Sequence, residues 1–330
     1  MSSVAKPLQH SATEVIPQGT SSISSADPCG STSRRWGVAN AMTIDVEDYF
    51  HVEAFASTIN RKDWDHLPQR VERNTERVLD ILAASGAQAT FFVLGWIAQR
   101  HPALVRRILT NGHELASHGT DHMRVDQLTP EAFRADVRQS KRALEDVGGV
   151  RVLGYRAPTF SISRDSSWAH ALLLEEGYRY SSSIYPLKHD LYGSPDAPRT
   201  AFAPVRGFVE VPLTTVRICQ VDVPASGGGY FRLFPYRLTR WLLDRANRGN
   251  GAPAVFYLHP WEIDVDQPRQ HRAPFLSRFR HYLNLSLTED RLQRLLGDFR
   301  WARMDHLFLT DGAAPVPLIT TWMDPKPRSR

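Results

Sequence analysis

The sequence of 330 residues contains only two cysteines, Cys29 and Cys219. So few cysteines exclude a disulfide scaffold and a zinc finger built on cysteines. No apolar run approaches the roughly 18 residues that a membrane-spanning helix needs. The apolar core of a secretory signal is also missing, so we expect a cytoplasmic protein, with membrane-peripheral and exported locations left open.

The excess of positive over negative charge is small. Forty Lys and Arg stand against 35 Asp and Glu, which gives a formal net charge of +5. An excess of this size, with no recognition motif beside it, does not indicate a nucleic-acid partner. Most of it lies in 266–303, which holds eight Arg against four acidic residues. This segment could be a solvated helix face or line a groove for an acidic polysaccharide.

The composition is that of a globular protein, with 42% hydrophobic and 23% charged residues. Residues 1–37 are rich in Ser, Thr, Gly and Pro and predict a disordered tail. From residue 40, strand-like apolar runs alternate with helical periodicity, which predicts an α/β fold with a parallel sheet. The expected strands are 41–46, 89–94, 114–117, 152–155, 208–212, 254–258 and 306–309, and the expected helices are 71–84, 97–109, 130–147, 166–176 and 235–248.

Two histidines, His118 and His122, follow the short strand 114–117. Side chains four residues apart lie on one face of a helical turn, so both imidazoles could reach one metal ion. An isolated pair of this kind is more often two partly exposed histidines. Its position after a strand favours a site, because α/β folds place their active sites at strand ends.

Three carboxylates, Asp45, Glu47 and Asp48, end the first strand. They repel each other unless a cation lies among them or they point apart. A solvated loop that caps a helix is the alternative. Together with the histidines, the cluster indicates a site of two histidines and one carboxylate, with a second carboxylate left as general base.

Two further strands end in candidate residues. Arg156 follows 152–155, and beside a carboxylate base it would keep that base ionised and oriented. His259 follows 254–258 and could protonate a leaving group, although either residue could also be structural. The four strand ends together predict a metal-dependent hydrolytic site.

Four ordered motifs make the sequence resemble the polysaccharide deacetylases of carbohydrate esterase family 4, which have the NodB-homology fold. They are TIDVEDYFH (43–51), SHGTDH (117–122), GYRAPTFSI (154–162) and FYLHP (256–260). The segments GGGYFRLFPY (227–236), HPWEID (259–264) and SRFRHYLNL (277–285) resemble a subfamily encoded beside exosortase and exopolysaccharide genes. We therefore expect a disordered tail over 1–37, a catalytic domain over 38–265 and a basic extension over 266–330 that packs on it.

The resemblance implies a distorted (β/α) barrel that hydrolyses N-acetyl groups of amino sugars in an exopolysaccharide or its precursor. It implies a divalent metal, commonly zinc, on His118 and His122, with Glu47 or Asp48 as the acidic ligand. By the same resemblance Asp45 is the catalytic base, Arg156 orients it and His259 is the general acid. The backbone N–H near Thr159 would hold the oxyanion.

The sequence departs from the family pattern at two positions. The usual Asp-Asp pair is Asp45-Val46 here, which favours Glu47 as the metal ligand and leaves Asp48 open. The acid that normally orients the general-acid histidine falls in 181–183, where all three residues are serine. Asp190 is the candidate substitute.

Two aromatic residues, Tyr230 and Trp261, are expected near the mouth of the site, where they could stack on sugar rings. Two other functions stay open. One is hydrolysis of a non-sugar C–N bond, such as a cyclic amide, on the same fold. The other is a non-catalytic polysaccharide-binding module, against which the complete set of candidate residues argues.

Overall fold

The computed structural model describes residues 37–190, 192–310, 313 and 315–323. The predicted tail therefore lies outside the described residues, apart from Gly37. Among the helices of the described part, none has the length and apolar character needed to cross a membrane.

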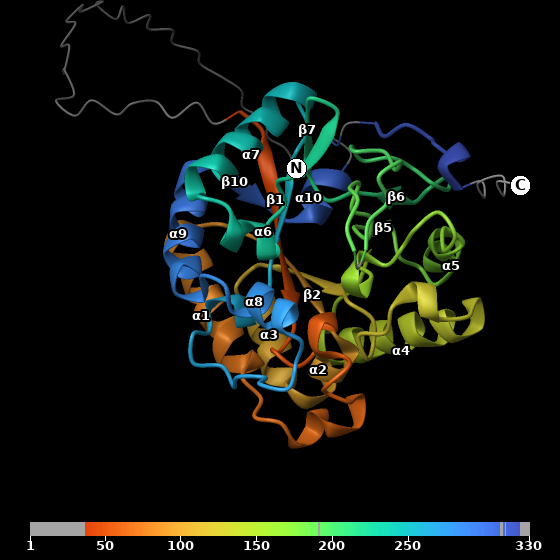
Figure 1. The fold of residues 1–330 in the computed structure, drawn as a ribbon. Coiled ribbons are helices and arrows are strands. Elements are labelled where there is room, and N and C mark those ends of the chain that lie inside the picture. The colour runs from red at the N-terminus through yellow and green to blue at the C-terminus, as the bar shows by residue number, and fades with distance from the viewer. Residues whose placement is uncertain (1–36, 191, 311–312, 314, 324–330) are drawn as a thin grey trace, which may run out of the picture. The chain divides into compact units, whose positions relative to one another are not determined.

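The core of the fold is a parallel, eight-stranded sheet (Figure 1). Its strands run in the order β10-β1-β2-β3-β4-β5-β6. Strand β9 lies outside this order and also pairs with β1. Helices surround this curled sheet, so the predicted distorted (β/α) barrel is confirmed. The strands are β1 Ala39–Val46, β2 Thr90–Val93, β3 Glu114–Ser117, β4 Gly154–Tyr155, β5 Tyr180–Ser181, β6 Val209–Glu210, β9 Val255–Leu258 and β10 Arg300–Ala302, with an antiparallel hairpin of β7 Thr215–Ile218 and β8 Val221–Pro224.

Helices connect the successive strands from β1 to β5 and from β8 to β10, as the sequence pattern predicts. In Figure 1, α7 and α9 lie on one side of β1, and α4 and α5 on the other. Local signals set their ends: Thr129 caps α4, and Gly149 ends it at a φ of 66°, which a side chain would strain. The helices are α1 Val71–Ser85, α2 Gly95–Arg100, α3 Pro102–Thr110, α4 Pro130–Gly148, α5 Ala169–Glu175, α6 Gly228–Leu233, α7 Tyr236–Asn250, α8 Phe275–Tyr282, α9 Thr288–Asp298 and α10 Met304–Phe308.

The structure differs from the predicted elements at two places. The helix expected over 97–109 is two helices, because Pro102 forces His101 out of the helical conformation. The prediction of a strand over 306–309 is wrong. These residues lie in and after α10, and the strand in this part of the chain is β10, which precedes α10. A short apolar run fits a strand and a buried helical turn equally well.

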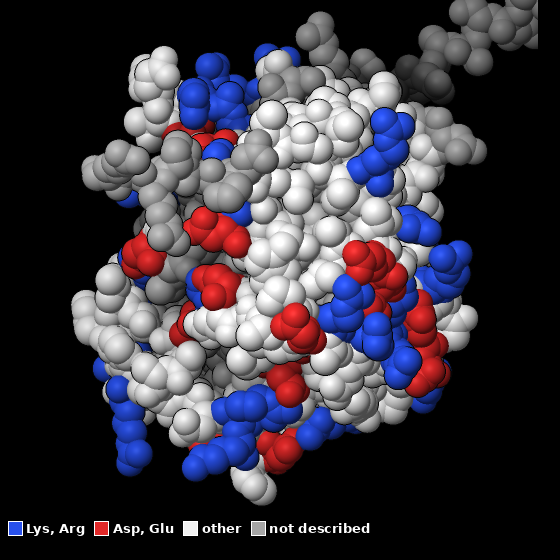
Figure 2. Space-filling model, turned by 90° about the vertical axis from the view of Figure 1, so that its right-hand side faces the viewer, with Lys and Arg blue, Asp and Glu red and all other residues white. Residues whose placement is uncertain are grey.

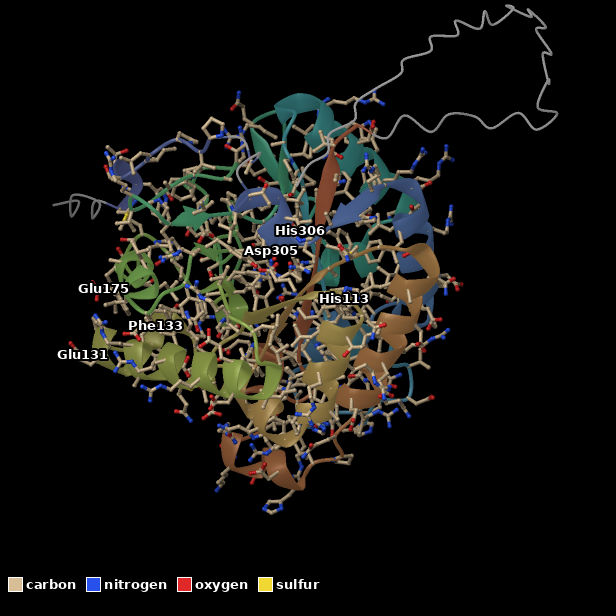
Figure 3. All side chains as sticks on the ribbon, turned by 180° about the vertical axis from the view of Figure 1, so that it is seen from behind. His113, Glu131, Phe133, Glu175, Asp305 and His306 are labelled. Carbon is tan, nitrogen blue, oxygen red and sulfur yellow. The ribbon has the colours of Figure 1, made fainter. Side chains whose placement is uncertain are left out.

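The C-terminal residues are part of the same folded unit. Strand β10 pairs with Ala39–Ala41 of β1. The Asp305 N–H donates to the Glu114 carboxylate, and Arg303 donates to the Gly112 carbonyl. Figure 3 shows Asp305 and His306 near His113, at the start of β3. The segment 300–308 thus covers the amino ends of the strands, the end away from the candidate site.

On the face that carries α4 and α5, basic and acidic side chains are interspersed (Figure 2). Arg134 pairs with Glu175 and Glu176, and Arg138 pairs with Glu176. Below these pairs, Phe133 of α4 is fully buried. The two helices therefore contact each other through ion pairs at the surface and apolar side chains beneath them. Together they shield the sheet from water.

Candidate active site

The candidate residues meet at the carboxyl ends of the strands. Asp45 lies at the end of β1 and Glu47 follows it. His118 and His122 follow β3, and Arg156 and His259 follow β4 and β9. Because these strands are parallel and neighbouring, their ends share one edge of the sheet. They surround a cavity of about 160 Å³, whose wall includes Asp45, Glu47, His118, His122, Thr159 and His259.

Glu47, His118 and His122 form a three-residue cluster. The Oε1 atom of Glu47 lies 3.0 Å from Nε2 of His118 and 3.0 Å from Nε2 of His122. The potential ligand atoms of the three side chains lie within 4.8 Å of one another. Nδ1 of His118 donates to the Arg156 carbonyl at 2.9 Å, which leaves the Nε2 lone pair directed at the cluster.

The cluster fits a divalent metal ion by its donor chemistry. Two imidazole nitrogens and one carboxylate are a ligand set that leaves positions open for water and substrate. Burial alone would raise the pKa of Glu47, but His122, His259 and His118 hold it well below its usual range. The buried carboxylate is therefore ionised and able to bind a cation.

Asp48, the other candidate ligand, has a different role in the structure. Its carboxylate accepts N–H groups of Tyr49, Arg70 and Val71 at 2.5–2.9 Å. Burial raises the pKa of Asp48 to about 6, although these hydrogen bonds oppose the shift. Asp48 thus caps the start of α1, and the structure brings Glu47, not Asp48, to the histidines.

Asp45 and Arg156 form a buried ion pair. Nη1 of Arg156 donates to Oδ1 of Asp45 at 2.6 Å and to Thr43 Oγ1 at 2.7 Å. The same guanidinium donates to the carbonyl and hydroxyl oxygens of Ser182. One oxygen of Asp45 is thereby fixed, and the other, Oδ2, lies 3.9 Å from Nε2 of His259.

His259 is oriented by Glu262, which the sequence interpretation missed. Nδ1 of His259 donates to Oε1 of Glu262 at 2.8 Å, and Nε of Arg232 donates to Oε2 at 2.6 Å. Burial alone would lower the pKa of His259, but Glu47, Glu262 and Asp45 raise it to about 9. His259 is therefore protonated at neutral pH, as a general acid requires.

Asp190, the predicted substitute for the missing acid, does not reach His259. It pairs with Arg280 at 2.8 Å and with His189 at 2.9 Å. The prediction for Asp190 was wrong because the partner comes from the helical turn Pro260–Ile263, which His259 itself caps. The signal was present in the sequence: Glu262 follows His259-Pro260 at the spacing of a capping box.

The remaining predicted residues lie around the cavity. Thr159 lines it and has a left-handed backbone, with φ of 56°. Trp261 also lines it, and its ring stacks on His259 with centroids 5.2 Å apart. Tyr230 is not among the residues in the cavity wall, whereas Tyr192 and Tyr257 are. Contact of Tyr230 with a sugar stays a prediction.

The comparisons with known proteins agree with the fold. Residues 63–180 match the polysaccharide deacetylase family, and 182–309 match a family described as a domain of unknown function, DUF3473. A crystal structure from Mycobacterium smegmatis that is named for a polysaccharide deacetylase superposes with a TM-score of 0.53. It is 21% identical and covers 85% of this chain and 90% of its own. Residues 63–180 are thus similar to the polysaccharide deacetylases, and the chain shares its fold with the superposed structure.

Two curated relatives resemble part of the chain. A peptidoglycan-N-acetylglucosamine deacetylase of Bacillus cereus is 37% identical over 71 residues, 22% of this chain and 33% of the relative. A chitooligosaccharide deacetylase of Rhizobium leguminosarum bv. trifolii is 37% identical over 70 residues, 21% of this chain and 33% of the relative. The matched segments thus span about a third of each relative.

Proposed function

We propose that the protein is an N-deacetylase that hydrolyses the acetamide of N-acetylated amino sugars in an oligosaccharide or polysaccharide. One observation carries the proposal: two differently paired acid–base groups converge on one cavity. Asp45 is held by the cation Arg156, and His259 is held by the anion Glu262. The contact with Arg156 orients Asp45 as the base, and Glu262 favours the protonated form of His259 as the acid.

The two groups have complementary roles in amide hydrolysis. Asp45 accepts a proton from the attacking water, and the hydrogen bond from Arg156 fixes its orientation. His259 donates the proton of Nε2 to the departing amine nitrogen, and Glu262 stabilises the imidazolium. A backbone N–H at Thr159 stabilises the oxyanion of the tetrahedral intermediate. The products are acetate and a free amino sugar.

A divalent ion, for which zinc is the proposed choice, would be held by Glu47, His118 and His122. When bound, such an ion supplies a water of lowered pKa and polarises the amide carbonyl. The burial of all three ligands keeps competing bulk water away from the site.

The substrate class is proposed from the relatives and the cavity. The relatives are named for peptidoglycan N-acetylglucosamine and for chitooligosaccharide. Trp261 and Tyr192 provide aromatic surface in the cavity wall, which suits a sugar ring. An exopolysaccharide or its precursor is the proposed polymer, because the motifs of 227–285 resemble those of enzymes encoded beside exopolysaccharide genes.

An acetate-release assay tests the proposal. Purified protein is incubated with N-acetylated chitooligosaccharides, with cyclic amides and with no substrate, before and after chelation and zinc add-back. We expect acetate from the oligosaccharides only, lost on chelation and restored by zinc, and absent in His118→Ala. Turnover of cyclic amides would favour the alternative hydrolase. Saccharide binding without turnover in every metal condition would favour a binding module.

A further inference from the structure

We infer that helix α8 is a membrane-docking element that inserts its apolar face into a bilayer of anionic phospholipid. Three side chains of this helix project into solvent: Phe275 is 78% exposed, Leu276 53% and Phe279 50%. Adjacent large apolar side chains with this much exposure are uncommon, and they mark an interaction surface.

The exposed residues share one face of the helix. At 100° per residue, Phe275, Leu276 and Phe279 fall within about 100° of one another. His281, on the opposite face, is buried. Its ring stacks on Trp261 with centroids 4.1 Å apart and contacts Phe55 at 4.5 Å. Helix α8 is therefore anchored by one face and leaves an apolar face uncovered in the described residues.

Basic side chains flank the apolar face. The segment 265–282 contains Arg269, Arg272, Arg278 and Arg280 against the single acidic residue Asp266. A short helix with aromatic and aliphatic residues on one side and arginines around it is the pattern of an interfacial helix. The arginines match a negatively charged surface, where each contributes electrostatic attraction.

The charge and shape favour a lipid surface over a protein groove. The apolar side chains project from a single helix, and the most exposed, Phe275, lies at its first residue. Such projecting side chains insert into the fluid interface of a lipid bilayer, which needs no preformed pocket of complementary shape. On the face that carries α4 and α5, by contrast, basic and acidic side chains pair with one another (Figure 2).

Docking through α8 would bring the candidate active site to the membrane. Trp261, on which His281 stacks, lines the catalytic cavity. Arg280 of α8 pairs with Asp190, two residues before Tyr192 of the same cavity wall. A lipid-linked saccharide would thus reach the cavity from the bilayer surface; this last step rests on the proposed deacetylase function, whereas docking does not.

Vesicle co-sedimentation of the full chain tests the inference. The probes are vesicles of phosphatidylcholine with phosphatidylglycerol and vesicles of phosphatidylcholine alone. We expect binding to the anionic vesicles. F275S/F279S should lose at least about tenfold in affinity, because the variant lacks the free energy gained when each Phe side chain moves from water into the bilayer. V221S, which changes an apolar residue 62% exposed on β8, is the control and keeps full binding.

A charge variant separates the electrostatic part. R272Q should weaken binding about fivefold at low salt and have little effect at high salt, while R106Q on α3 should have none. Acetate release from a soluble oligosaccharide should be unchanged in F275S/F279S. Absence of vesicle binding, or binding that F275S/F279S leaves intact, overturns the inference. A dimer that dissociates in F275S/F279S also overturns it, because the face would then cover a second copy.

Discussion

Glu262 accepts a hydrogen bond from Nδ1 of His259 at 2.8 Å, three residues away along the same chain segment. The second carboxylate oxygen is bound by Arg232, whose Nη1 also donates to three carbonyl groups of residues 280–283. The orientation of the proposed general acid therefore depends on how α6 contacts the C-terminal part of the chain.

Replacing Glu262 by Gln should lower kcat by about 10- to 100-fold, the usual effect of losing a partner that orients a catalytic histidine. KM should change little, because Glu262 does not line the cavity. Steady-state kinetics on a chitooligosaccharide would measure both constants. D266N, which changes an exposed acid nearby, is the control; equal kcat in E262Q and D266N would refute the positioning role.

A metal-content measurement should distinguish the roles of Glu47 and Asp48, the two acids that follow β1. E47Q should lose the divalent ion and the activity, because it removes the ionised ligand between the two histidines. D48A should keep the ion but lose about 1–3 kcal/mol of stability, since three buried N–H groups lose their acceptor. Elemental analysis and thermal unfolding of both variants would check this, and loss of metal in D48A alone would reverse the assignment.

Lysine should not replace Arg156. A guanidinium donates at once to Asp45, Thr43 and Ser182, and an ammonium cannot match that planar arrangement. We expect R156K to lose about 100-fold or more in kcat, the contribution of a well-placed general base. R151K, at an exposed position, should keep wild-type rates. Full activity in R156K would show that Asp45 does not need the planar guanidinium.

Glu114 should make the fold less stable as the pH rises. Burial, and then the charge of Asp305, raise its pKa from 4.5 to about 7. The folded state therefore binds more protons than the unfolded state between these values, so its stabilising contribution is complete below pH 4.5 and is lost as the pH rises through about 7. E114Q should flatten this part of the profile of melting temperature against pH, whereas E131Q, at an exposed position, should not.

Much of the candidate site could be predicted because its residues lie at strand ends. The order of the strands brings Asp45, His118, Arg156 and His259 to one edge of the sheet, whatever the details of the helices. Sequence could not decide between Glu47 and Asp48, because both follow β1 and only the position of α1 shows which one caps a helix.

The C-terminal part was harder to predict, for a physical reason. Strand β10 has three residues, half-buried or exposed, and α10 has five, too few to show a period. Their conformations depend on tertiary contacts: β10 follows the ladder of β1, and α10 is held by the bond from Asp305 to Glu114. Tertiary context overrides local preference in such short elements.

Strand β1 is completed by partners more than 200 residues away in sequence, β9 and β10. During synthesis, the edge of β1 that binds β9 must therefore wait until residues 255–258 have been translated. Contacts of this separation carry a large loop-closure entropy and slow folding. The strand that carries Asp45 is thus made before two of the strands that pair with it, so Asp45 and the adjacent Glu47 acquire their final surroundings only after β9 and β10 are in place.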